Sequence, residues 1–226
     1  TALAEAPDGG IWVGTIRGLN RLAPGPDGGI TQLAAFAGTS VFALTQGSRG
    51  ELWVGTDRGL ARVRHDTVRF YTRRHGLYDD VAFAVLEDGE GYLWTSSNRG
   101  IARVAIAELD AHDRGELAAV RHVAYGTRDG LPATQCNGVA QPAGWRTRDG
   151  RLLFPTIQGL AVVEPRRLRV NPLPPPVVLE KVIVGDVDVD PRLPVRAPAG
   201  TSRLQVEFAA LTYISPARVS FRHRLE

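Results

Sequence analysis

Polar side chains that could bind a ligand lie in segments where otherwise similar stretches of this sequence differ. Tyrosine, aspartate, arginine and asparagine side chains together suit a polar ligand, such as a glycan or an acidic sugar. The alternative interpretation is that these segments are ordinary solvated loops. The candidate ligand-binding residues are Asp57, Arg58, Tyr78, Asp79, Asp80, Asn98, Arg99, Gln135 and Asn137.

No catalytic pattern accompanies this binding hypothesis. The five histidines show no HExxH pairing, and the sequence has no GxSxG elbow, Walker loop or dinucleotide-binding glycine pattern. Asp79 and Asp80 are adjacent, so along a strand they would face opposite ways and make a poor acid–base pair. Cys136, the single cysteine, is expected to be a packed thiol and permits no intrachain disulfide. We therefore expect no catalytic residue, no metal site and no cofactor.

An internal repeat positions the candidate residues. Glu51–Val63, Ile11–Leu22 and Leu93–Val104 read almost alike, and Leu152–Val163 is a degenerate fourth copy. Successive tryptophans of the first three copies are 41 residues apart. A fixed period of this size indicates a repeat architecture, and each copy predicts four short antiparallel strands, the make-up of one propeller blade. The insertion Ala105–Leu117 is rich in helix formers and predicts a short surface helix.

The predicted fold class is all-β. About four propeller blades of an incomplete propeller are expected in residues 1–166, at about 1–37, 38–73, 74–126 and 127–166. Residues 167–176 form a stiff, proline-rich linker. Beyond it, alternating strands at Val177–Val184, Arg203–Ala210 and Val219–Leu225 predict the start of an immunoglobulin-like sandwich, truncated within residues 177–226.

The repeated residues are expected to build the blades rather than the ligand site. A tryptophan that recurs in every copy serves what every copy must do, which is to pack, and each ring buries on the order of 200 Å². Arg17, Arg58 and Arg99 recur just before a turn glycine, and a packing or turn role is favoured for them over ligand contact. In a propeller, the loops between strands two and three share one face with the blade-joining segments. The candidate residues are expected on that face.

Charge and hydropathy exclude several classes of function. The 27 Lys and Arg are interspersed with 24 Asp and Glu, so no cationic block indicates binding to nucleic acid. No apolar run approaches the roughly 18 residues of a membrane span. The first residues do not resemble a signal peptide and begin within a repeat, so we expect the chain to be a piece of a longer protein.

Several motifs resemble a known family. Gly76–Asp88, with the following Leu93-Trp94 and the turn Asn98–Ile101, resembles the two-component regulator propeller repeat. The run Tyr125–Pro132 resembles the last blade of such propellers. Pro174–Val178 and Leu204–Tyr213 resemble the immunoglobulin-like domain, named for three tyrosines, that follows them; Phe221 and His223 stand where tyrosines are usual, whereas Tyr213 matches.

The resemblance implies a bacterial periplasmic sensor region of a membrane-anchored protein. Its parent would be a sensor histidine kinase, a hybrid two-component regulator or a diguanylate cyclase. The expected partners are an oligosaccharide or other small polar ligand, and a second copy that forms a homodimer through the sandwich domain. Two alternatives stay open: a carbohydrate-active propeller enzyme, either a lyase or a glycosidase, and a protein-interaction scaffold. We also expect a chain with so few blades to associate or be poorly soluble, because blade faces and strand edges stay exposed.

Overall fold

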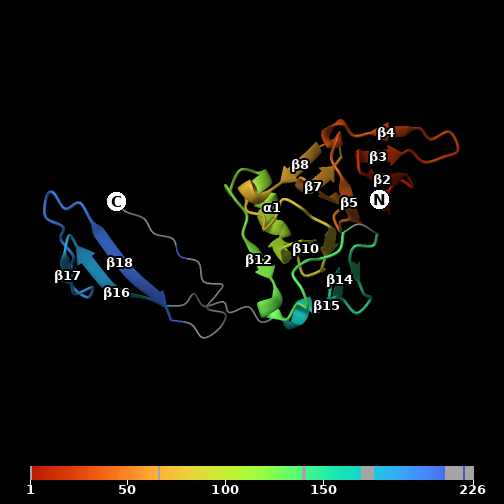
Figure 1. Ribbon diagram of the computed structural model, residues 1–226. Helices are drawn as coiled ribbons and strands as arrows, with labels where there is room; N and C mark the ends of the chain where they lie inside the picture. Colours follow the sequence, from red (N-terminus) through yellow and green to blue (C-terminus); the bar gives the residue numbers. More distant parts are fainter. Residues whose placement is uncertain (1, 66, 139–140, 169–175, 212–220, 222–226) are drawn as a thin grey trace. The chain divides into compact units, whose positions relative to one another are not determined.

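The computed structural model describes residues 2–65, 67–138, 141–168, 176–211 and 221 (Figure 1). The chain divides into two compact units, Thr1–Leu168 and Arg169–Glu226, and each is considered by itself. Among the described residues, no helix combines the length and the apolar character needed to cross a membrane.

The first unit contains one antiparallel sheet for each sequence repeat, and strand order follows the chain. Blade 1 consists of β1 (Ala2–Glu5), β2 (Ile11–Thr15), β3 (Gly18–Leu22) and β4 (Ile30–Gln32). Blade 2 consists of β5 (Val41–Gln46), β6 (Leu52–Thr56), β7 (Gly59–Arg64) and β8 (Thr67–Tyr71). Blade 3 consists of β9 (Ala84–Glu87), β10 (Tyr92–Ser97), β11 (Gly100–Ala105) and β12 (His122–Tyr125). Blade 4 consists of β13 (Trp145–Arg146), β14 (Leu152–Thr156) and β15 (Gly159–Val163).

The turn between the second and third strands explains two repeated residue types. The Thr56 hydroxyl donates to the carbonyl of Gly59 at 2.8 Å and accepts the backbone N–H of Arg58 at 3.0 Å. Gly59 has φ +106°, and a Cβ there would lie 2.1 Å from the carbonyl oxygen of Tyr71. Only glycine fits this position, because a side chain would clash and the backbone is left-handed. The geometry of this turn therefore accounts for the recurrence of the hydroxyl residue and the glycine in each copy.

The first strands of the blades lie next to one another, with β5 beside both β1 and β9, and β9 beside β13. Blade 4 departs from the predicted four strands: the described residues form three, with an isolated bridge from Cys136 to Thr156. The segment before β13 contacts blade 1. The side-chain amide of Gln141 accepts the N–H of Leu3 at 2.5 Å and donates to the Leu3 carbonyl at 2.8 Å. Gln141 thus bonds to Leu3 of β1, the edge strand of blade 1.

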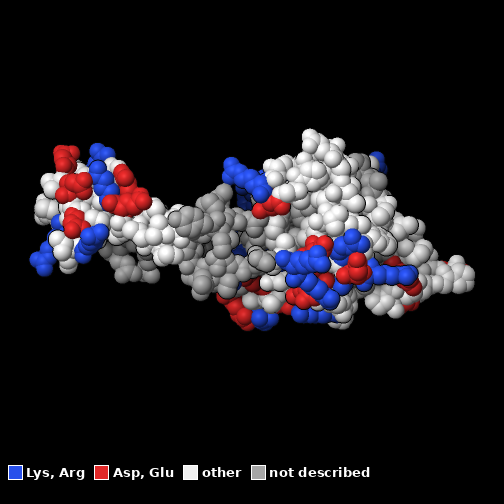
Figure 2. Space-filling model, turned by 90° about the horizontal axis from the view of Figure 1, so that it is seen from below, with Lys and Arg blue, Asp and Glu red and all other residues white. Residues whose placement is uncertain are grey.

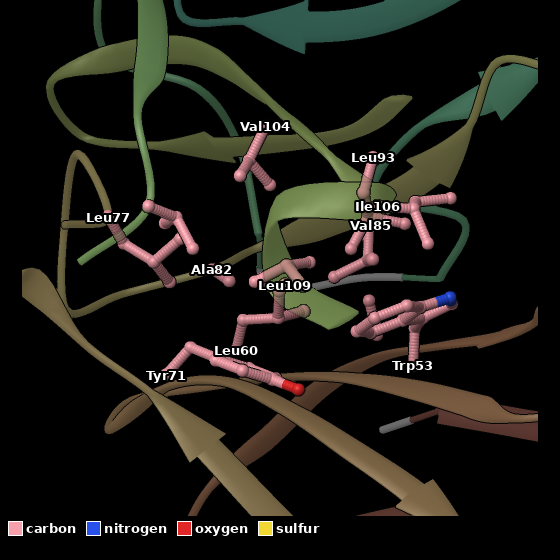
Figure 3. Packing of buried hydrophobic residues seen from close by; sticks show 12 residues of the cluster. Trp53, Leu60, Tyr71, Leu77, Ala82, Val85, Leu93, Val104, Ile106 and Leu109 are labelled. Carbon is pink, nitrogen blue, oxygen red and sulfur yellow. The ribbon is translucent and has the colours of Figure 1, made fainter. Parts of the chain in front are cut away.

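The repeated tryptophans fill the core, as predicted. Trp53 and Trp94 are fully buried, and Trp12 is half-buried. The predicted helix is present as α1 (Ile106–Asp113); it lies at the surface with Ala107 exposed and one side buried. Ile106 and Leu109 are fully buried against blades 2 and 3, as Figure 3 shows for Leu109 above Leu60 and Tyr71. Their i, i+3 spacing puts both on one side of the helix.

Four 3₁₀ turns complete the unit. They are η1 (Ala34–Phe36), η2 (Arg73–His75), η3 (Thr127–Asp129) and η4 (Pro165–Arg167). The first three follow the outer strands of blades 1 to 3, where the chain turns towards the next blade. η4 follows β15, and Pro165 at its start has no N–H with which to continue a sheet.

The described residues of the second unit form a three-stranded antiparallel sheet of order β17-β16-β18. Its strands are β16 (Val177–Val184), β17 (Val187–Val189) and β18 (Leu204–Ala210). The first and second predicted strands are therefore present, and β17 is an additional hairpin strand paired with the end of β16. The predicted strand Val219–Leu225 lies outside the described residues except for Phe221, whose ring centroid is 4.7 Å from that of Phe208. Tyr213 and His223 also lie outside them, and the sandwich stays a prediction.

Candidate functional site

Backbone hydrogen bonds bring the predicted ligand-binding residues to one end of the blades. The N–H of Ala82 donates to the carbonyl of Thr56 at 3.0 Å, and that of Cys136 donates to Ser97 at 3.1 Å. Each segment entering a new blade is thereby tied to the end of the second strand of the preceding blade. We call this end, with its strand two–three turns and blade-joining segments, the loop end.

Asp57 is held in place by the segment that enters its own blade. Its Oδ1 accepts the backbone N–H of Ser40 at 3.0 Å, and its own N–H donates to the Ser40 carbonyl at 3.1 Å. The neighbouring Arg58 is exposed, and only its backbone N–H is engaged, by Thr56. Asp57 therefore shapes the loop end, whereas the Arg58 guanidinium is available to a ligand.

Tyr78 and Arg99 form the most tightly connected pair of the loop end. The Arg99 guanidinium lies 4.9 Å from the centre of the Tyr78 ring. The Tyr78 hydroxyl donates to the Arg99 carbonyl at 3.0 Å, and Arg99 Nη1 reaches the Tyr78 carbonyl at 3.4 Å. The ring centroid of His122, at the start of β12, lies 5.4 Å from that of Tyr78. A cation–π contact with two reciprocal hydrogen bonds fixes an aromatic ring beside a positive charge.

The two adjacent aspartates are engaged in local turns. Asp80 Oδ1 accepts the N–H of Arg73 at 2.7 Å, and Asp79 Oδ1 accepts the N–H of Asp80 at 2.8 Å. Gln135 and Asn137 contribute backbone bonds, to Ile157 at 3.1 Å and to Pro155 at 2.9 Å. These contacts are structural and do not pair two carboxylates.

Four of the candidate side chains are exposed without a hydrogen bond to any other described residue. They are Arg58, Asn98, Gln135 and Asn137. They come from blades 2 and 3 and from the segment entering blade 4, and they supply one cation and three amides. Such groups can hydrogen-bond hydroxyl and carboxylate groups of a polar ligand. Within the described residues, no group of three or more His, Cys, Asp or Glu could hold a metal ion.

A second polar cluster, which the sequence analysis missed, lies at the opposite end of the blades. Arg62 is buried, with Nη1 2.6 Å from Asp110 Oδ1 and 3.4 Å from Asp113 Oδ2 of α1, and Nη2 3.4 Å from Glu51 Oε1. Tyr71 donates its hydroxyl to Asp113 at 2.7 Å. Each carboxylate of the cluster binds an arginine or accepts a hydroxyl group. The cluster therefore holds α1 against blade 2 and offers no free acid or base.

The cluster belongs to a repeated pair of residues. Arg21, Arg62 and Arg103 each lie directly across from the tryptophan of the adjacent strand. Their guanidinium carbons lie 5.4, 4.8 and 5.6 Å from the tryptophan rings. The sequence contains a pattern that could have revealed this pair: an arginine nine residues after each of these three tryptophans. Blade 4 lacks both partners, since Leu153 lies opposite Val162.

Burial and ion pairing shift several ionisation equilibria in this unit. Partial burial on its own would raise the pKa of Asp110, but hydrogen bonds from Arg62 and Arg49 outweigh it and lower this pKa below its ordinary value. Burial raises the pKa of the Cys136 thiol to about 11, so the thiol is neutral and unreactive at neutral pH. As predicted, Cys136 is a packed residue.

The charge distribution gives no single-signed patch on the face drawn in Figure 2. There, blue arginine groups alternate closely with red carboxylates. A pocket of about 280 Å³ lies between the inner strands β5 and β9 and the segment Gln141–Arg146. A larger crevice lies between blades 1 and 2 at the end opposite to the loop end. None of the nine predicted ligand-binding residues lines either space.

The comparisons with known proteins agree with the repeat and the fold. Residues 35–58 match the two component regulator propeller family. This match covers the entry into blade 2, β5, β6 and the turn that carries Asp57 and Arg58. No curated protein matches the sequence significantly.

Solved extracellular domains of signalling proteins share the fold. The extracellular domain of BT3049, a hybrid two-component system of B. thetaiotaomicron, superposes with a TM-score of 0.65 at 21% identity over 91% of this chain and 26% of its own. The extracellular domain of BT4673 from the same organism gives 0.59 at 18% identity, over 73% and 23%. The chain thus spans about a quarter of the length of these structures. Virginiamycin B lyase of Staphylococcus aureus reaches only 0.46 at 18% identity, over 71% and 54%, too low to bear on function.

Proposed function

We propose that this chain is part of the periplasmic sensor region of a bacterial two-component signalling protein. The observation that carries the proposal is the family match of blade 2 at residues 35–58, in a chain whose fold is that of extracellular domains of such systems. The proposal gives the chain a recognition role, not a catalytic one. In the longer protein, the second unit would dimerise and pass the signal to a membrane helix and a cytoplasmic kinase or cyclase.

The proposed ligand is an oligosaccharide bound at the loop end. Arg58 and Asn98 occupy the exposed turns of neighbouring blades, and the Tyr78–Arg99 pair joins the segment between blades 2 and 3 to the turn of blade 3. An aromatic ring fixed beside a cation gives a sugar ring a stacking surface and an acidic sugar a counter-charge. Gln135 and Asn137 extend the polar surface towards blade 4.

A thermal-shift titration tests the ligand. Oligogalacturonides serve as the acidic probe and xylo-oligosaccharides as the neutral one. At saturation we expect one probe class to raise the Tm of the chain by about 3 °C or more, because binding to the folded state stabilises it. Arg58→Ala and Asn98→Ala should abolish the shift. Arg148→Ala, at an equally exposed turn of the opposite end, is the matched control and should keep it.

Two results would contradict the proposal at different levels. If Arg58→Ala and Asn98→Ala bind the probe as the unchanged chain does, the loop end is not the site. If the complete reading frame encodes neither a membrane helix nor a signalling domain, the sensor role itself is wrong.

A further inference from the structure

The crevice between blades 1 and 2 has a volume of about 970 Å³ and is lined mostly by apolar side chains. On blade 1, its wall includes Trp12, Arg21 and Leu33. On blade 2, Leu52 and Val63 face them. This size is at the upper end of the range for sites that bind ligands. The crevice lies within the first unit and at the end opposite to the loop end, so it is independent of the proposed oligosaccharide site.

The repeat shows what such a crevice accommodates. Trp12 and Arg21 form the same cross-strand pair as Trp53 and Arg62 in blade 2. Leu33 occupies the position in blade 1 that Tyr71 has in blade 2. The N–H of Leu33 donates to the carbonyl of Leu19, and Tyr71 pairs with Leu60, the corresponding residue of the third strand of blade 2. The corresponding residues of blade 2, namely Trp53, Arg62 and Tyr71, are the residues against which α1 packs.

Helix α1 therefore defines the chemistry of an occupant. Its Ile106 and Leu109 cover the tryptophan, and its Asp110 and Asp113 bind the arginine and the tyrosine. In blade 3, this helix is inserted between β11 and β12 and covers the preceding blade. In blade 2, β7 ends at Arg64 and β8 begins at Thr67, so no insertion covers blade 1.

The uncovered pair shows the consequence. Trp53 is fully buried, whereas Trp12 is only half-buried. Arg62 has three carboxylates within 3.4 Å, whereas Arg21 has Asp8 alone among the described residues. The Nε atoms of Arg21, Arg62 and Arg103 are all buried without a hydrogen-bond partner in the described part of the chain, so the contrast between the two blades rests on the burial of the tryptophan and the number of carboxylates.

The charges around the crevice favour an acidic occupant. Its titratable lining consists of Asp8, Arg21, Arg49, Arg64 and His65. Arg49 already pairs with Asp110, and Arg64 lies 3.9 Å from Glu51, but both side chains remain about half exposed. Each of the three arginines thus has one carboxylate nearby, and Arg49 and Arg64 keep exposed guanidinium surface at the rim that a further carboxylate can contact.

We propose that this crevice docks a short amphipathic helix of a partner protein, one that carries two aliphatic side chains at i, i+3 followed by carboxylates. The bound helix repeats the packing of α1 one blade earlier. Its aliphatic pair covers Trp12, and its carboxylates reach Arg21 and the arginines of the rim. Helix-in-groove recognition of this kind uses anchors spaced at i, i+3 and i+4.

A fluorescent peptide that carries residues 103–116 of this chain is the probe, since it holds α1 and its flanks. Anisotropy titration into the 226-residue chain should give saturable binding. Thr31 lies directly opposite Arg21 on the exposed edge strand and lines the crevice. Thr31→Glu should weaken binding by roughly tenfold, because its carboxylate competes for Arg21 and repels the peptide. Ile30→Glu, on the same strand but outside the crevice lining, should leave binding unchanged.

Charge reversal on the peptide completes the test. A peptide with lysine at the positions of Asp110 and Asp113 should bind the unchanged chain more weakly and recover affinity towards Thr31→Glu. Circular dichroism checks that both variants fold. Absence of saturable binding would overturn the proposal, as would binding that Thr31→Glu leaves unaltered, because the peptide would then occupy another surface. Self-association of the chain that Thr31→Glu abolishes would overturn it too, by making a second copy the occupant.

Discussion

At the scale of single residues, the polar partner of each repeated tryptophan distinguishes blades that read alike. Trp94 donates its indole N–H to Asp88 at 2.8 Å, and Asp88 also accepts the N–H groups of Glu90 and Tyr92. In blade 2, the residue six positions before the tryptophan is Gly47, and the indole N–H of Trp53 has no partner among the described residues. A carboxylate thus organises the first hairpin of blade 3, whereas the arginine contact with the tryptophan ring is common to both blades.

Replacement of Asp88 by alanine is expected to destabilise the chain by about 3 kcal/mol, because three donors lose a charge-assisted acceptor and one of them is fully buried. Asp88→Asn, which keeps one acceptor oxygen, should cost less. Urea unfolding followed by tryptophan fluorescence measures both, with the exposed Asp27→Ala as control. A loss no larger than that of the control would show that the three bonds do not organise the hairpin.

Acid should loosen the attachment of α1. The pKa of Asp110 in the folded state lies below its ordinary value, because Arg62 and Arg49 outweigh the effect of its burial. A lowered folded pKa contributes stability above the ordinary value, near 3.9, which is lost as pH falls through the folded value. Tm measured from pH 6 down to pH 3 should therefore fall less steeply in Asp110→Asn than in the unchanged chain. Asp27→Asn should keep the original slope; equal slopes for all three would contradict the assignment.

At the scale of elements, α1 shows that local composition can predict a helix without predicting which of its residues are buried. Residues 105–117 contain good helix formers, which predict the helix by themselves. Its packing depends on Ile106 and Leu109 lying on one side, and on Arg62 and Tyr71 of another blade. These partners are distant in sequence, so the local pattern did not reveal them. The helix joins two blades.

Leu109→Ala is expected to cost about 3 kcal/mol of unfolding free energy, since it removes a fully buried side chain between blades 2 and 3. Ala107→Ser, on the exposed side of the same helix, should change it by less than about 0.5 kcal/mol. Urea denaturation of both variants measures the difference. Similar small losses in both would mean that Leu109 does not hold α1 against blades 2 and 3.

At the scale of the whole molecule, what repeats could be predicted and what joins the copies could not. Tryptophan spacing and turn glycines predict the blades, because each copy obeys its own strand and turn geometry. The bond from Gln141 to Leu3 spans most of the first unit and has no local signal. In the candidate site, the sequence predicts a shared face, but not that the side chains of Asp57 and Arg99 bind neighbouring backbone groups.

Within the first unit, the sheet of blade 4 presents an exposed apolar surface for association. Strand β15 lies at the edge of its three-stranded sheet, with Leu160 and Val162 54% and 50% exposed on one side and Ala161 and Val163 buried on the other. An exposed strand edge flanked by apolar side chains pairs readily with another chain.

We therefore expect the molar mass from light scattering to rise with concentration, and Val162→Lys to suppress this rise by adding charge to the edge. Ile16→Lys places the same charge on an exposed apolar residue in a turn of blade 1 and serves as the matched control. A chain that stays monomeric at millimolar concentration would show that the edge of blade 4 is protected. A control variant that suppresses association equally would show that net charge, and not β15, governs it.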